Sequence, residues 1–175
     1  MKSVDAEQWI EAARHGDLAA FERLYRHYVD RIYGLCLRML ANHSDAEDSV
    51  QNAFISAWRK LDQFRGQSDF GTWLHRIAVN EVLMMQRRRP FEAAADWDAQ
   101  LPARMPKLDA QIDLEAAIAE LPDQARNIFV LRALYGYSHG EIAQFTGIAA
   151  GTARAHYHRA RQFLQRRIGL EDKHD

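Results

Sequence analysis

The sequence predicts an all-α protein built from two helical domains joined by a flexible linker, the C-terminal one a helix-turn-helix. Apolar residues recur in steps of three and four along most of the chain, the spacing of helices with one buried face. No alternation of apolar and polar residues is long enough to predict a β-strand. The helical period is lost over residues 90–112, which contain three of the four prolines. We therefore expect domains at 1–89 and 113–170 and a linker at 90–112.

Composition excludes several classes of protein. The 175 residues are 47% apolar and 27% charged, which is typical of a globular protein. No stretch approaches the roughly 18 uninterrupted apolar residues of a membrane span, and Asp5 and Glu7 stand where a signal peptide would be apolar. A single cysteine, Cys36, excludes an internal disulfide and a multi-cysteine zinc site. We expect a cytoplasmic protein with no membrane insertion, no bound metal and no cofactor.

Two helices are predicted at the start of the chain. The first covers about residues 5–14. The second begins near Asp17, after Gly16, and ends near Asn42, a length of roughly six turns. Its apolar residues recur at helical spacing and should form its buried face: Leu18, Phe21, Tyr25, Tyr28, Ile32, Leu35 and Met39.

Two more helices are predicted before the linker. Ser44 and Glu47 have the spacing of a capping box, which predicts the start of the third helix. A polar loop at 64–69 leads into the fourth helix, which opens near Phe70 and ends before Pro90 because proline cannot continue a helix. The buried face of the third helix should consist of Ala46, Val50, Ala53, Phe54, Ala57, Trp58 and Leu61.

The last part of the chain predicts the helix-turn-helix. Pro122 suits the first turn of a helix that Gly136 ends. Ser138 and Glu141 form a second capping box, and Gly147 can adopt the left-handed conformation of a tight turn. A second helix follows from about residue 150, with a buried stripe of Ala153, Tyr157, Ala160 and Leu164.

Charge is segregated along the chain, although its net value is only −1. Residues 151–168 contain five arginines and no acid, and residues 87–89 are all arginine. Residues 90–125 contain eight acids against Arg104 and Lys107. This pattern favours two basic surfaces joined by an acidic stretch.

The second helix of the helix-turn-helix is a candidate site for duplex DNA. Arginine at its exposed positions can pair with guanine or grip a phosphate, and the N-terminus of a helix attracts phosphate. The alternative is a solvated basic helix in a helical bundle. The tight turn, together with five arginines in a segment that contains no acidic residue, favours DNA binding. The candidate residues are Gly151, Thr152, Arg154, Ala155, His158 and Arg159.

One flank of the fourth helix is a candidate site for single-stranded nucleic acid. It carries an aromatic ring that can stack on a base, an amide that can read a base edge, and arginines that can hold the backbone: Trp73, Arg76, Asn80, Met84 and Arg87. Taken alone, the pattern slightly favours a plainer interpretation, in which Trp73 belongs to the core and the arginines complement the helix dipole.

The start of the third helix is acidic. Its three acids precede two amides: Asp45, Glu47, Asp48, Gln51 and Asn52. The acids can stabilise the first turn through the helix dipole or dock a basic partner surface, and the residues alone leave both open.

No phosphate-binding glycine loop, nucleophile elbow or pair of catalytic carboxylates is present, and the eight histidines lack a metal-binding spacing. We therefore expect a protein that is not an enzyme.

Taken in order, these motifs resemble the extracytoplasmic-function (ECF, group 4) sigma factors of bacterial RNA polymerase. The resemblance covers about residues 15–168. It rests on Asp45-Ala46-Glu47-Asp48 leading into Phe54-Ile55-Ser56-Ala57-Trp58, on Phe64-Arg65-Gly66, on Phe70-Gly71-Thr72-Trp73 through Asn80, on Leu121-Pro122, on Gly136-Tyr137-Ser138 with Glu141-Ile142-Ala143, and on Gly151-Thr152-Ala153-Arg154 with His158-Arg159-Ala160-Arg161.

The resemblance implies partners and roles for the N-terminal domain. Core RNA polymerase would be bound at the clamp of its largest subunit by Asp45, Glu47, Asp48, Gln51 and Asn52. The melted −10 element of the promoter would be read by the loop, which would hold a base flipped out of the strand, and by the flank of the fourth helix. The residues implied are Phe64, Arg65, Gly66, Gln67, Ser68, Trp73, Arg76, Asn80, Met84 and Arg87.

The resemblance also implies roles for the rest of the chain. The second helix of the helix-turn-helix would lie in the major groove of the −35 element and contact it through Gly151, Thr152, Arg154, Ala155, His158 and Arg159. The contact with polymerase would extend to its flap region. Residues 90–112 would thread toward the active-site and RNA-exit region of polymerase. An anti-sigma factor would hold the protein inactive by covering its polymerase-binding surfaces.

The chain departs from the family pattern at two places. Met84 stands where many relatives carry an aspartate, which leaves the −10 preference open. The recognition helix reads Gly-Thr-Ala-Arg-Ala-His-Tyr instead of the common Gly-Thr-Val-Lys-Ser-Arg-Leu, so the −35 sequence is not inferred. Two alternatives remain: a stand-alone helix-turn-helix regulator, and a sigma-like decoy that sequesters an anti-sigma factor.

Overall fold

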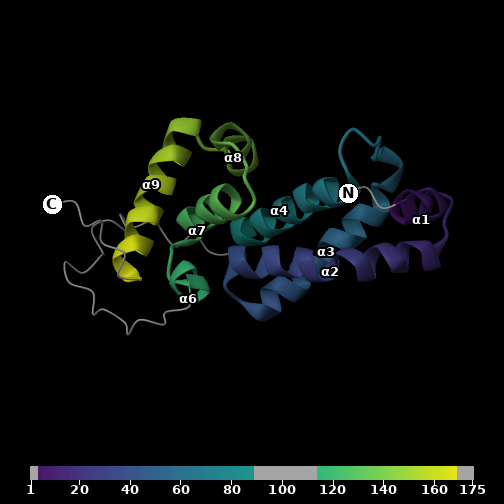
Figure 1. Cartoon of the computed structure of the whole chain (residues 1–175), viewed down its shortest axis with the longest axis horizontal. Helices are drawn as coiled ribbons and strands as arrows, with labels where there is room; N and C mark the ends of the chain where they lie inside the picture. Colours follow the sequence, from purple (N-terminus) through teal and green to yellow (C-terminus); the bar gives the residue numbers. More distant parts are fainter. Residues whose placement is uncertain (1–3, 89–113, 169–175) are drawn as a thin grey trace. The chain divides into compact units, whose positions relative to one another are not determined.

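A computed structural model describes residues 4–88 and 114–168, and within these ranges the regular structure is entirely helical (Figure 1). The chain divides into two compact units, Met1–Met85 and Gln86–Asp175. The predicted all-α class is therefore confirmed. The predicted linker at 90–112, Arg89 and the last residues of the predicted second domain lie outside the described residues.

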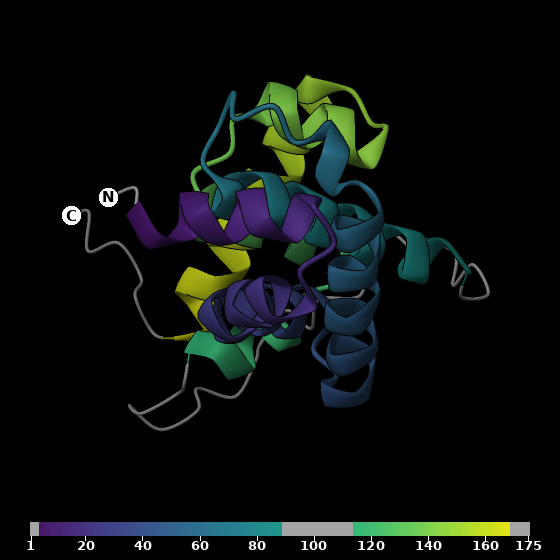
Figure 2. The same cartoon turned by 90° about the vertical axis from the view of Figure 1, so that its right-hand side faces the viewer.

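The first unit is built around a long central helix. In chain order it contains α1 (Val4–Arg14), α2 (Leu18–Leu40), α3 (His43–Arg59), the 3-10 turn η1 (Leu61–Gln63) and α4 (Phe70–Arg88), whose last turn crosses the division between the units. Both α1 and α3 pack on α2 (Figure 1 and Figure 2). The start of α4 joins this core where the rings of Tyr28 and Phe70 lie 5.4 Å apart.

Side-chain caps fix the starts of α2 and α3. The Asp17 carboxylate accepts hydrogen bonds from the backbone N–H groups of Ala19 and Ala20, at 2.9 and 3.1 Å. The N-cap of α3 is Asn42, whose Oδ1 accepts from the Asp45 N–H at 3.0 Å. The predicted capping box of Ser44 with Glu47 is therefore wrong. Ala41 ends α2 in a left-handed conformation, with φ at 51°, so α3 begins at His43 before Ser44 can act as a cap.

The buried face of α2 differs from the predicted one in its first turns. Leu18 is 70% exposed and Tyr25 is 38% exposed, so these two predictions are wrong. Tyr25 remains partly exposed although its ring lies 4.7 Å from that of Phe54 on α3. The buried residues of α2 are Ala20, Leu24, Ile32, Leu35, Cys36, Met39 and Leu40. The predicted face of α3 is confirmed, with Trp58 half-buried.

The loop at 64–69 is tied to α4 by an aspartate. The Asp69 carboxylate accepts hydrogen bonds from the N–H of Thr72 at 2.9 Å and from its hydroxyl at 2.5 Å, and these bonds lower the pKa of Asp69. Gly71 lets α4 approach α2 closely, since a Cβ at this position would lie 2.9 Å from Cε1 of Tyr28. The start of α4 is thus fixed both by its own cap and by α2.

The second unit packs its shorter helices against one long helix. It contains α6 (Leu114–Ala119), α7 (Asp123–Phe129), the π-helical segment η2 (Val130–Leu134), α8 (His139–Thr146) and α9 (Ala150–Arg167), and α9 contacts α6, α7 and α8. Pro122 is the N-cap of α7, one position before the first turn in which it was predicted. The capping box of Ser138 with Glu141 is confirmed, and Gly147 ends α8 with a φ of 75°.

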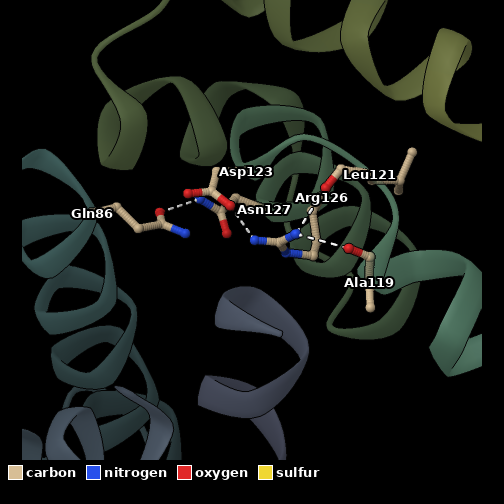
Figure 3. A network of polar contacts seen from close by, with 6 residues as sticks. All are labelled: Gln86, Ala119, Leu121, Asp123, Arg126 and Asn127. Atoms are coloured by element: carbon tan, nitrogen blue, oxygen red, sulfur yellow. Dashed lines mark hydrogen bonds and ion pairs between the residues drawn. The ribbon is translucent and has the colours of Figure 1, made fainter. Parts of the chain in front are cut away.

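A buried arginine organises the turn between α6 and α7. Arg126 is 5% exposed, and its guanidinium pairs with the Asp123 carboxylate (Figure 3). It also donates to the carbonyl oxygens of Ala119 and Leu121, at 3.2 and 2.8 Å. These bonds satisfy carbonyls that the end of α6 leaves without a helical partner. On α9, Ala153, Ala160 and Leu164 are buried as predicted, whereas Tyr157 is only half-buried.

Candidate nucleic-acid interface

The acidic residues of α3 form part of an exposed face. Glu47, Asp48, Gln51 and Asn52 are exposed, and Asp45 is half-buried in the first turn. The opposite side of α3 is buried against α2, so the acids and amides are directed outward. This face can offer negative charge and hydrogen-bond acceptors to a basic surface.

An apolar residue that sequence reasoning left out of the site belongs to the same face. Ile55 is 48% exposed. It follows Gln51 by four residues and Asn52 by three, which places all three on one side of α3. Its spacing from Gln51 was the signal that could have identified it. The face therefore combines charge with an apolar contact.

The loop between η1 and α4 presents small and polar groups and hides its aromatic residue. Residues 65–69 are exposed, and Gly66 adopts a left-handed conformation with φ at 69°. Phe64 is only 7% exposed, and its ring lies 5.6 Å from that of Phe70 and 5.2 Å from that of Trp73. Phe64 is thus placed to anchor the loop, while the exposed positions that follow it are available to a ligand.

The predicted row on α4 lies on one exposed side of the helix. Arg76, Asn80, Met84 and Arg87 are exposed, and their spacing of three or four residues aligns them. Trp73 is half-buried, with its ring 5.5 Å from that of Phe70. Trp73 therefore contacts the core and remains partly accessible. The sequence allowed either a core residue or a base-stacking residue, and a half-buried ring is compatible with both. The row continues from the loop through the cap at Asp69.

A cavity of about 710 Å³ lies beside the loop, and α1 and α2 form its other walls. Basic and acidic side chains alternate with aromatic ones around it, including Glu11, Arg14, Tyr28, Arg31, Arg65 and Asp69. Burial, and next the negative charge of Asp69, raises the pKa of Tyr28, so its hydroxyl stays protonated near neutral pH. Sequence reasoning missed the contribution of α1 because the contacts join segments about fifty residues apart.

The predicted recognition residues lie on α9 in the second unit. Gly151, Thr152, Arg154 and His158 are exposed, and Ala155 and Arg159 are half-buried. The pKa of His139 is lowered by burial and then by the charges of Arg132 and Arg154, and the pKa of His156 is lowered by burial and then by Arg159. These histidines remain neutral near neutral pH, and the arginines supply the positive charge of the face.

Two kinds of site are not found in the described part of the chain. Within residues 4–88 and 114–168, no three His, Cys, Asp or Glu side chains are grouped so that they could hold a metal ion. Among the same residues, no helix combines the length and the apolar character needed to cross a membrane.

Family models and relatives match both units. The model for Sigma-70 region 2 matches residues 24–90, and that for Sigma-70 region 4 matches residues 111–164. The RNA polymerase sigma-H factor of Pseudomonas aeruginosa is 34% identical, with 93% of each chain covered. The ECF RNA polymerase sigma factor SigW of Bacillus subtilis is 33% identical, covering 91% of this chain and 94% of that protein. The ECF sigma-E factor of Escherichia coli K12 is 34% identical, with 91% and 92% covered.

Solved structures agree with this assignment. The sigma factor RpoE from Bartonella quintana, determined in complex with the anti-sigma factor NepR, matches with a TM-score of 0.61 and 27% identity, covering 86% of this chain and 98% of that one. CnrH, determined with the cytosolic domain of CnrY, matches in fold with a TM-score of 0.59 over 96% and 99% of the two chains. The present chain belongs to the extracytoplasmic-function family of RNA polymerase sigma factors.

Proposed function

We propose that this protein binds core RNA polymerase and directs initiation at specific promoters, under the control of an anti-sigma factor. One observation carries the proposal: the exposed residues predicted to contact nucleic acid fall on two faces of different character. One is the exposed loop at 65–69 with the row on α4, and the other is the arginine-bearing α9 of a helix-turn-helix. A regulator of duplex DNA needs only the second face. A protein that reads both melted and duplex promoter DNA needs both.

The exposed face of α3 is the proposed contact with the polymerase clamp. A basic surface of the clamp would contact the acids and amides of this face, Asp45, Glu47, Asp48, Gln51 and Asn52. Ile55 adds an exposed apolar group beside them. The carboxylates of Asp45, Glu47 and Asp48 would themselves supply the negative charge of this contact, without phosphorylation. A charged rim around an apolar contact is the usual composition of a specific protein interface.

The loop and α4 are the proposed site for the melted −10 element. Arg65, Gly66, Gln67 and Ser68 would surround a base flipped from the strand, and Phe64 would hold the loop from below. The partly exposed ring of Trp73 offers stacking, and Asn80 offers an amide to a base edge. Arg76 and Arg87 would bind phosphate. Met84 supplies an apolar contact instead of a carboxylate.

The N-terminal turns of α9 are the proposed site for the −35 element. Gly151 and Thr152 would place backbone N–H groups toward a phosphate, and Arg154 and His158 would enter the major groove. Ala155 and Arg159 are half-buried and would contact the edge of the groove. The second unit would also approach the polymerase flap. Residues 90–112 are proposed as the connection between the two domains.

The remaining parts of the proposal follow from the relatives. Sigma factors are transcription initiation factors, and we propose that this one has no enzymatic activity of its own and works in the cytoplasm with polymerase. The complex of the related RpoE with NepR supports control by an anti-sigma factor. The partner would cover the polymerase-binding face, so its stoichiometric co-purification before induction is expected.

Binding to purified core polymerase tests the clamp assignment. Replacing Asp45, Glu47 and Asp48 together by lysine should abolish binding, because the face would then repel a basic clamp. Circular dichroism should show largely unchanged helical content, since of the three acids only Asp45 lies in the first turn of α3, where an acid contributes about 0.3–1 kcal/mol. Replacing the exposed acids Glu7, Asp30 and Asp62 by lysine is the matched control and should leave binding intact. Equal binding by both triple variants contradicts the assignment.

Core binding, measured together with duplex-DNA binding and run-off transcription, separates the two alternatives. Absence of core binding by the unmodified protein, with tight binding of duplex DNA, would indicate a stand-alone regulator. Core binding without initiation on any promoter would indicate a decoy that titrates an anti-sigma factor.

A further inference from the structure

The first helix contacts the loop that is proposed to read melted DNA, although it lies before the residues that match the region 2 family model. The contact is made by Arg14, the last residue of α1. Its Nη2 donates a hydrogen bond to the carbonyl oxygen of Phe64, fifty residues later in the chain. Its Nη1 donates to Glu11 at 3.2 Å, which holds the guanidinium in place from its own helix.

The guanidinium also lies against the Phe64 side chain. Its central carbon is 5.8 Å from the centroid of the Phe64 ring, within the range of a cation–π contact. The Nε atom of Arg14 is buried and has no hydrogen-bond acceptor among the described residues. Holding the side chain here therefore has a desolvation cost, which the bonds at its other two nitrogens offset.

Phe64 is the point at which the exposed loop leaves the core. Its ring is buried against Phe70 and Trp73, and its carbonyl is held by Arg14. At the other end of the loop, Asp69 is held by Thr72. The exposed residues 65–68 thus span two fixed points, one supplied by α4 and one by α1.

We propose that Arg14 is a positioning residue for recognition of the melted promoter strand. By fixing the Phe64 carbonyl it restricts the backbone of residues 65–68, and so determines which base fits the loop. This inference rests on the proposed function of the loop. The apolar residues Ala6, Ile10 and Ala13 are buried and hold α1 in the fold, so Arg14 is not required for the helix to dock.

The expected effect is a loss of base selectivity. Without the Arg14 bond the loop samples more conformations, and the preferred base loses its advantage over the others. Because Arg14 restrains the loop and does not itself touch the base, we expect about a two- to tenfold effect, less than the full worth of a hydrogen bond from a charged donor. Binding of core polymerase should not change, because the exposed face of α3 is not involved.

The test compares Arg14→Met with the unmodified protein in reconstituted holoenzyme. Methionine keeps an unbranched apolar stem over Phe64 and removes both donors. Run-off transcription is measured on pre-melted templates that carry each of the four bases at each position of the −10 element. We expect the ratio between the best and worst base, at the position read by the loop, to fall about two- to tenfold in the variant.

Two matched variants distinguish positioning from general stability. Arg26→Met removes an exposed arginine that pairs with Glu22 at 2.6 Å on α2, away from the loop, and should leave selectivity unchanged. Ile32→Val lowers stability at a buried position and should also keep selectivity, even where its melting temperature matches that of Arg14→Met. Core binding and thermal melting are recorded for every variant.

The outcomes separate this inference from the proposed function. Wild-type selectivity in Arg14→Met, or an equal loss in Ile32→Val, overturns the role of Arg14 and leaves the proposed function intact. Unmodified holoenzyme that shows no base preference overturns both. If Arg14→Met does not fold, Arg14→Ala decides: it removes every donor and leaves the buried Ala6, Ile10 and Ala13 that hold α1, so selectivity should be reduced, and wild-type selectivity overturns the inference.

Discussion

The Ser56 hydroxyl donates a 2.7 Å hydrogen bond to the Glu81 carboxylate, and this bond joins the acidic helix α3 to α4, the helix proposed to contact the melted strand. Both side chains are half-buried, so water replaces the bond only in part. We expect Ser56→Ala to lower the free energy of unfolding of the first unit by about 1.5–3 kcal/mol, the usual range for a hydrogen bond to a charged group. Urea denaturation measures this loss. In the Glu81→Gln background the same substitution should cost less, and an equal cost would assign the effect to packing.

Arg126 should be the most sensitive charged position of the second unit. Arg126→Met removes the partner of Asp123 and leaves the buried Leu121 carbonyl without its donor. We expect a loss of about 2–4 kcal/mol, because a buried acceptor without a donor is costly. The control is Arg132→Met, since Arg132 is exposed and makes a 3.2 Å bond to the Tyr137 carbonyl. Thermal melting should show a much smaller loss there, and similar losses in the two variants would contradict the account.

His75 should make the first unit sensitive to mild acid. Burial, and next the charge of Arg31, lowers its pKa from 6.5 to about 4, so the folded protein holds it neutral. The unfolded chain binds this proton below about pH 6.5, and stability therefore falls as the pH drops from 6.5 toward 4. Between pH 7 and pH 5 the expected loss is about 2 kcal/mol. Urea denaturation at several pH values measures it, and His75→Gln should flatten the dependence. An unchanged slope in that variant would exclude His75 as its source.

Arg154 should contribute to recognition of duplex promoter DNA. Arg154→Ala should weaken use of promoters with a −35 element by about 1–3 kcal/mol if the side chain pairs bidentately with a base. Arg166 is exposed in the last turn of the same helix and serves as the control. Transcription from a series of promoters that differ in the −35 sequence measures both variants. Equal responses to Arg154→Ala and Arg166→Ala across the series would show that Arg154 does not contribute to recognition of the −35 sequence.

The helices themselves could be predicted because their signals are local. Apolar spacing, the capping box at Ser138 and the glycines at 136 and 147 are all read within a few residues. The start of α3 was misplaced because Asn42 and Ser44 are both good caps, and the choice between them depends on Ala41. Ala41 adopts a left-handed conformation, which is uncommon for alanine and is therefore not predicted from the sequence.

Residues that depend on packing were harder to predict. Periodicity identified α2 as a helix, but the extent of its covered face depends on how far α1 and α3 reach over it, which left Leu18 and Tyr25 exposed. Helical spacing predicted which residues share the exposed sides of α4 and α9, but their roles in recognition came from the family resemblance and stay predictions. The bonds of Arg14 to Phe64 and of Ser56 to Glu81 join segments 50 and 25 residues apart, and no local pattern contains that information.

Run-off transcription measures whether this protein directs initiation at a specific promoter. Purified core polymerase is supplied with the promoter region upstream of this protein's own gene, with and without the protein, and core binding is scored in the same reaction. We expect a defined transcript that depends on the added protein, with −10 and −35 elements upstream of its mapped start. Core binding without a transcript on this or any other promoter tried, or no core binding at all, would contradict the assignment of this chain as an initiating sigma factor.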